Sequence, residues 1–166
     1  MKLLLRAFFP VTAILAVFAS GKAPADIPSD PLRFFDGATE SLGTLKVLMR
    51  KAVATRSVGQ GEIKPDGSLA LVQRVEGEGR PLHIRRWLIR RVAPGHFVGT
   101  MSDATGPVTI DQVGDRYRFR FDMSGSMSVE EWLTPLPDGK SAISNMTVRK
   151  FGFAVANSQG TIRKIP

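Results

Sequence analysis

Turn-forming dipeptides recur about every eight to twelve residues, and this spacing constrains the fold more than any other feature of the chain. Asp-Gly and Pro-Gly steps supply the positive φ and the preset φ that tight turns need. The intervals are too short for the crossover helices of a parallel sheet, so the spacing predicts antiparallel hairpins. The turn signals are Pro65-Asp66-Gly67, Gly77-Glu78-Gly79, Pro94-Gly95, Gly106-Pro107, Gly114-Asp115, Ser124-Gly125 and Pro137-Asp138-Gly139.

Between these turns, apolar and polar residues alternate with the period of two that a half-buried strand requires. The clearest stretch is 116–123, where apolar Tyr117, Phe119, Phe121 and Met123 alternate with charged residues. Residues 69–76 alternate more weakly, and 146–155 predict a closing pair of strands. Residues 42–54 also fit a helical face, but their β-branched second half favours one strand, or one long bent strand.

The expected fold class is all-β. Eight to ten short strands in hairpin succession, over about 135 residues, leave two edges that must be protected. Closure into a single antiparallel up-and-down (lipocalin-like) β-barrel removes both edges most directly. A barrel of this size is either filled by its own side chains or holds one small ligand.

Residues 1–25 are predicted to be a signal peptide. Lys2 and Arg6 precede an apolar run, residues 7–19, and Ala23-Pro24-Ala25 offers a small-x-small cleavage site. The alternative, an uncleaved membrane anchor, is disfavoured because the run falls short of the ~20 apolar residues that span a bilayer. We expect residues 26–31 to form an exposed lead-in and residues 32–166 the barrel domain, in the periplasm.

Loss of the signal changes the charge of the chain. Lys2, Arg6 and Lys22 leave and no acid does, so the formal net charge falls from +8 to +5. An exported basic protein meets anionic lipid and envelope polymers rather than nucleic acid, so we predict no nucleic-acid partner. The chain has no cysteine, which excludes disulfides and thiolate chemistry.

Several short motifs resemble those of the DUF3833 family, small envelope proteins of Gram-negative bacteria without an assigned activity. The matching positions run from about Phe34 to Lys164, nearly the whole mature chain, and the resemblance implies a lipocalin-like fold. Many members carry a lipobox cysteine after the signal, whereas this chain has Ala19-Ser20-Gly21-Lys22 there, so a soluble periplasmic protein is expected. The matches are Phe34-Phe35-Asp36-Gly37, Thr39-Glu40, Gly43, Trp87, Gly99-Thr100, Asp103, Gly106, Pro137-Asp138-Gly139, Asn145-Met146 and Lys150-Phe151-Gly152.

The candidate ligand-binding residues come from two predicted strands. Residues 80–91 hold five arginines, and neither face of this stretch is cleanly apolar, as expected of a barrel strand with an inward cation. An inward arginine would pair with a carboxylate or phosphate head group. The alternative places these arginines on a solvated face. The candidates are Arg85, Arg86, Trp87, Tyr117, Phe119 and Phe121.

A row of cations, Arg116, Arg118 and Arg120, occupies the charged face of the strand at 116–123. We expect acids on a neighbouring strand, Glu130 or Glu131, to offset their repulsion. Contact with anionic lipid or an envelope polymer is the alternative.

No catalytic, metal or cofactor site is predicted. The chain lacks a Gly-x-Ser-x-Gly motif, and neither His83 nor His96 has an evident carboxylate partner in the sequence. We therefore predict a non-enzyme that binds a small amphipathic or lipid-like ligand. The alternative is a structural or interaction module of the cell envelope, with a filled barrel and a basic outer surface docking to another envelope protein. An interior cavity below about 300 Å³ would favour that module.

Overall fold

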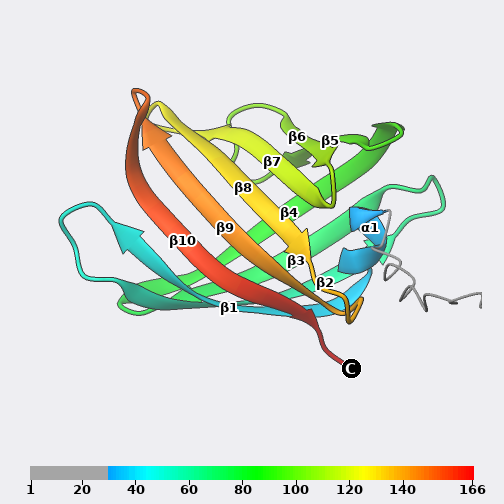
Figure 1. The fold of residues 1–166 in the computed structure, drawn as a ribbon, viewed down its shortest axis with the longest axis horizontal. Coiled ribbons are helices and arrows are strands. Elements are labelled where there is room, and N and C mark those ends of the chain that lie inside the picture. The colour runs from blue at the N-terminus through cyan, green and yellow to red at the C-terminus, as the bar shows by residue number, and fades with distance from the viewer. Residues whose placement is uncertain (1–29) are drawn as a thin grey trace, which may run out of the picture.

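A computed structural model describes residues 30–166, which form ten antiparallel strands and one short helix (Figure 1). Each strand pairs with its neighbours in sequence, and β1 pairs with β10, so the sheet is a closed barrel. This confirms the predicted all-β up-and-down barrel at the upper end of the expected strand number. The elements are α1 (Pro31–Phe35), β1 (Gly37–Val47), β2 (Val53–Ile63), β3 (Leu69–Gly77), β4 (Arg80–Ala93), β5 (His96–Met101), β6 (Val108–Val113), β7 (Arg116–Met123), β8 (Met127–Pro135), β9 (Ser141–Lys150) and β10 (Phe153–Lys164).

The period-two alternation places apolar side chains inside the barrel. On β7, Tyr117, Phe119 and Phe121 are buried, whereas Arg116 and Asp122 between and beside them are exposed. On β3, Leu69 and Leu71 are buried and Val72 is exposed. Burial of these alternate side chains supplies the apolar contact that holds the sheet together.

The sequence analysis expected one strand, or one long bent strand, over residues 42–54, and this prediction is wrong. β1 ends at Val47 and β2 begins at Val53, with a turn between them in which Met49 has φ 62°. No helix forms there. Leu45 and Val47 keep the inward positions of a strand, and Leu48 and Met49 lie in the turn, so the apparent helical spacing joins residues of two elements.

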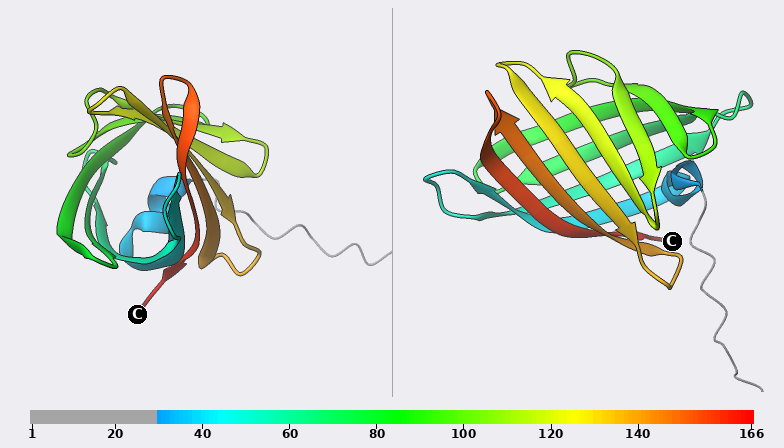
Figure 2. Two further views of the ribbon diagram at one scale, coloured as in Figure 1. Left: turned by 90° about the vertical axis from the view of Figure 1, so that its left-hand side faces the viewer. Right: turned by 45° about the horizontal axis from the view of Figure 1, so that its top comes forward.

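Helix α1 covers one end of the barrel and was not predicted. Asp30 caps it by accepting a hydrogen bond from the backbone N–H of Leu32 at 2.9 Å, and Pro31 stands in its first turn. Pro31 is buried, so the expected exposed lead-in already ends before it. Leu32, Phe34 and Phe35 pack into the barrel, and Figure 2 shows α1 at the far end when the barrel is viewed from its open end.

The predicted signal peptide and most of the lead-in lie outside the described residues. Within residues 30–166, no helix is long and apolar enough to cross a membrane. The most deeply buried side chains, among them Leu69, Phe97, Tyr117 and Leu133, belong to the strand ends nearest α1. The core is therefore concentrated at the covered end, which leaves room in the rest of the barrel.

The acid that offsets the arginine row on β7 is neither Glu130 nor Glu131. Arg120 and Arg118 instead approach Asp111 of β6, at 2.8 and 3.5 Å. The guanidinium groups of Arg116 and Arg118 also lie over the ring of Trp132 on β8, at 4.4 and 5.6 Å from its centroid. Antiparallel pairing places β6 on one side of β7 and β8 on the other. The carboxylate that contacts the arginine row is Asp111, from β6.

Candidate functional site: an internal cavity

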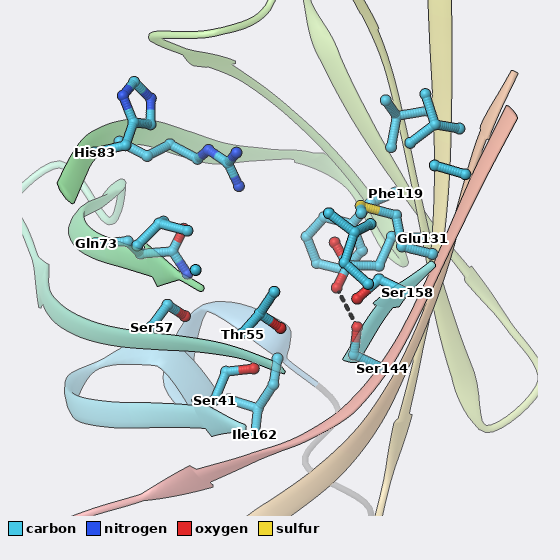
Figure 3. A pocket seen from close by; sticks show the side chains of 18 of the residues that line it. Ser41, Thr55, Ser57, Gln73, His83, Phe119, Glu131, Ser144, Ser158 and Ile162 are labelled. Atoms are coloured by element: carbon cyan, nitrogen blue, oxygen red, sulfur yellow. Dashed lines mark hydrogen bonds between the residues drawn. The ribbon is translucent and has the colours of Figure 1, made fainter. Parts of the chain in front are cut away.

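A cavity of about 530 Å³ occupies the barrel between the packed core and the open end (Figure 3). Inward side chains of β1 to β4 and β7 to β10 line it, together with Phe35 of α1. Its size falls within the range of small-molecule sites, roughly 300–1,000 Å³. The barrel is therefore not filled by its own side chains.

Small inward residues explain the empty space. On β1, β2, β9 and β10, alternate inward positions hold Ser41, Ser57, Ser144 and Ser158 rather than bulky side chains. In Figure 3 the labelled side chains at these positions point into the cavity. Each of these four strands contributes one of the serines, and together the small side chains leave a space that bulky residues would fill.

Most of the opposite wall is apolar and aromatic. The rings of Trp87 and Phe121 meet edge to face with their centroids 6.0 Å apart. The indole N–H of Trp87 donates to Oε1 of Gln73 at 2.7 Å, so the ring is fixed at both edges. Leu71, Ile89 and Phe119 extend this apolar surface.

The structure separates the six predicted site residues into three groups. Four of them line the cavity: Arg85, Trp87, Phe119 and Phe121. Arg86 is exposed on the outer face of β4, because successive residues of a strand point to opposite sides. Tyr117 points inward but lies in the packed core near α1 and does not line the cavity.

Arg85 belongs to a network that joins β4 to the loop after β5. Its Nε donates to Oδ2 of Asp103 at 2.9 Å, and Nε2 of His83 lies 2.9 and 3.0 Å from the two carboxylate oxygens. Ser102 Oγ donates to Asp103 Oδ1 at 2.9 Å. Partial burial raises the pKa of Asp103, but the hydrogen bonds from His83, Ser102 and Arg85 outweigh it and the net pKa is lowered.

The structure gives each histidine a carboxylate neighbour that was not evident in the sequence. His83 faces Asp103, and His96 Nδ1 lies 2.9 Å from Oδ1 of Asp111. Each partner is 15 or 20 residues away along the chain and comes beside the histidine only through strand pairing. Local sequence carries no signal for such pairs.

Glu131 is the site residue that the sequence analysis missed. It follows Val129 on the inward face of β8, and its Oε1 accepts a hydrogen bond from Ser144 Oγ at 2.6 Å (Figure 3). Enclosure within the barrel raises the pKa of Glu131, and the Ser144 hydrogen bond and the charge of Arg85 only partly oppose this. Its position between Val129 and Leu133 in the period-two pattern was the available signal.

These groups can bind but are not arranged for the common hydrolytic chemistry. Ser102 donates to Asp103 and not to His83, so the three side chains do not form the serine–histidine–aspartate relay of hydrolases. Within residues 30–166, no group of three or more potential metal ligands is found. The arrangement offers a largely apolar volume that Arg85 and Glu131 face.

The fold and the cavity together define a class: a closed, antiparallel, lipocalin-like β-barrel with an internal cavity. The chain matches no family model and no curated protein. It does resemble solved structures. The S-type phycobiliprotein lyase CPES from Guillardia theta aligns with a TM-score of 0.62 at 10% identity, covering 81% of this chain and 90% of that one.

A protein of unknown function from the DUF3598 family of Nostoc punctiforme PCC 73102 aligns with a TM-score of 0.61 at 9% identity. The alignment covers 81% of this chain and 48% of that protein. At these identities the two likenesses establish the fold alone.

Proposed function

We propose that the protein is a non-catalytic binding protein for a small amphipathic ligand, held in the barrel cavity. The cavity of about 530 Å³ carries this proposal. It exceeds the size of about 300 Å³ below which a filled structural module would be favoured. An apolar ligand body would replace water on the Trp87, Phe119 and Phe121 wall, where burial of apolar surface drives binding.

The polar end of the ligand would lie between Arg85 and Glu131. Both line the cavity, and the charge of Arg85 acts on Glu131. Arg85 uses Nε for Asp103, which leaves its terminal nitrogens to donate to an acidic head group. Because burial favours the neutral form of Glu131, this side chain can itself donate to such a head group instead of repelling it.

The proposal also covers catalysis, location and family membership. The likeness to a phycobiliprotein lyase is compatible with a ligand-binding barrel, and catalysis is the competing class. Export to the periplasm rests on the predicted signal peptide, and envelope contacts rest on the basic charge. The structure has the barrel fold that the resemblance to DUF3833 implied. Membership of that family stays a prediction, because no family model matches the chain.

Mass spectrometry of organic extracts from natively purified protein tests the proposal. We expect a co-purifying amphiphile in the parent protein and its loss in Ala156→Phe, which places a ring in the cavity. A matched control is Ala54→Phe, because Ala54 is exposed on the outer side of β2. The same extract from all three proteins, or a compound chemically converted on incubation with the protein, would contradict a non-catalytic binding role.

A further inference from the structure

Two turns lie at the open end of the barrel, opposite α1. One joins β1 to β2 at residues 48–52, and the other joins β9 to β10 at residues 151–152. The backbone N–H of Leu48 donates to the carbonyl of Val155 at 2.8 Å, which joins the first turn to the start of β10. We call residues 46–53 and 149–153 the rim; Figure 1 shows both turns at the end away from α1.

The rim carries the most exposed large apolar side chains of the described residues. Their exposed fractions are 63% for Leu48, 94% for Met49, 75% for Phe151 and 77% for Phe153. Other exposed apolar residues of the described chain do not exceed 52%. These four side chains contribute little to the core, so packing within the barrel does not explain them.

Two of these residues also hold unfavourable backbone conformations. Met49 has φ 62° and Phe151 has φ 51°, a region that glycine adopts readily and a bulky residue does not. Other turns of the described chain place glycine at positive φ, for example Gly67 and Gly95 at the α1 end and Gly79 at the open end. Met49 and Phe151 thus keep apolar side chains at positions where glycine would fit the backbone better, which points to a role outside folding.

Cations surround the apolar tips. The rim contains five of them and no acidic residue. Among the described carboxylates, none forms a salt bridge with these cations, whereas Arg56 and Arg163 on the barrel wall share Glu40. The five are Lys46, Arg50, Lys51, Arg149 and Lys150.

We propose that the rim docks on an anionic lipid surface. The four apolar side chains enter the boundary between head groups and acyl chains, and the five cations lie against the phosphates. A bilayer fits this surface better than a protein does, because the apolar side chains project from separate turns instead of forming one flat patch. Cavity-lining Val47 and Val155 lie directly beside the turns, so docking presents the open end of the cavity to the membrane.

Tryptophan reporters on vesicles with brominated acyl chains, half phosphatidylglycerol and half phosphatidylcholine, test the proposal. We expect Phe151→Trp to show quenching beyond that of the parent protein, because bromine quenches only indoles that reach the acyl region. Val113→Trp is the matched control, since Val113 is also exposed but lies beside the β6–β7 turn at the α1 end. Equal added quenching at both positions, or none at either, would overturn the proposal.

Charge variants provide the second arm, measured by co-sedimentation with the same vesicles. The double variant Lys51→Gln/Lys150→Gln should weaken partitioning by about fivefold for each cation removed, and Lys140→Gln at the α1 end should not. Binding of the parent should disappear on pure phosphatidylcholine. If the protein bound the vesicles through residues 1–29, the double variant and Lys140→Gln would partition equally. Equal partitioning of these two variants would contradict docking through the rim. Neither arm depends on ligand binding in the cavity.

Discussion

The role of Glu131 as a cavity-lining residue is clear in the structure but was not recognised in the sequence. Glu130 and Glu131 are adjacent acids, yet Glu131 is enclosed in the barrel with Ser144, whereas Glu130 accepts from the indole of Trp132. Strand parity alone assigns them to opposite sides. The same alternation separates Arg85 from Arg86, both of which the sequence analysis named as candidate site residues.

Replacement of Glu131 by Gln should stabilise the protein in a pH-dependent way. The folded state raises the pKa of Glu131 above its ordinary 4.5, so the folded protein binds this proton more tightly than the unfolded chain. Stability due to this group is therefore present below pH 4.5 and is lost as the pH rises through the folded-state pKa. Urea unfolding from pH 4 to 8 should show no gain for Glu131→Gln at the acidic end and a growing gain above it.

Glu130→Gln is the matched control for that series. Its side chain lies on the outer face, so this substitution removes a carboxyl group that is not enclosed in the barrel. A gain in Glu131→Gln that is independent of pH would show that the carboxyl group is not destabilised by its burial.

Arg85→Met and Arg86→Met should differ in both stability and binding. Loss of the Arg85–Asp103 hydrogen bond should lower the free energy of unfolding by about 1 kcal/mol, since Asp103 keeps His83 and Ser102 as donors. Fatty-acid binding should weaken about tenfold, the equivalent of one charge-assisted hydrogen bond. Arg86→Met should change stability by less than about 0.5 kcal/mol. Thermal melts and titrations of both variants measure this, and equal binding by the two would remove Arg85 from the site.

At the scale of elements, strands with clear alternation were predictable and their connections less so. The stretch at 116–123 matches β7 because one face is apolar and the other charged. Helix α1 was missed because five residues are too few for a helical period, although Asp30-Pro31 is a helix-start signal. The turn at 48–52 was missed because its apolar side chains are exposed, against the usual pattern of turns.

The closing helix depends on a glycine in β2. A Cβ atom on Gly61 would lie 1.9 Å from the carbonyl oxygen of Phe35, at the end of α1. Gly61→Ala should therefore push α1 from the barrel end and lower the free energy of unfolding by about 1–3 kcal/mol. Gly106→Ala is the control, because nothing lies within 4 Å of its added Cβ. Urea unfolding of both variants measures the difference, and equal stabilities would mean that α1 does not press on Gly61.

The whole molecule is a barrel with two unlike ends. Within residues 30–166, ten paired strands leave no open sheet edge, α1 and the core cover one end, and the other end leads into the cavity. Closure was predictable from the number of strands and the need to protect their edges. The cavity was not, because its volume depends on how the small inward residues of four strands face one another across the barrel.

Fluorescence titration of Trp132→Phe with saturated fatty acids of increasing length tests the central claim that the cavity binds an amphipathic ligand. This variant leaves Trp87, which lines the cavity, as the one tryptophan of the chain. We predict saturable quenching at one ligand per protein, with affinity rising about fourfold per methylene and levelling off once the cavity is full. Quenching that is absent, that never saturates, or that persists unchanged in the Ala156→Phe variant would contradict the account.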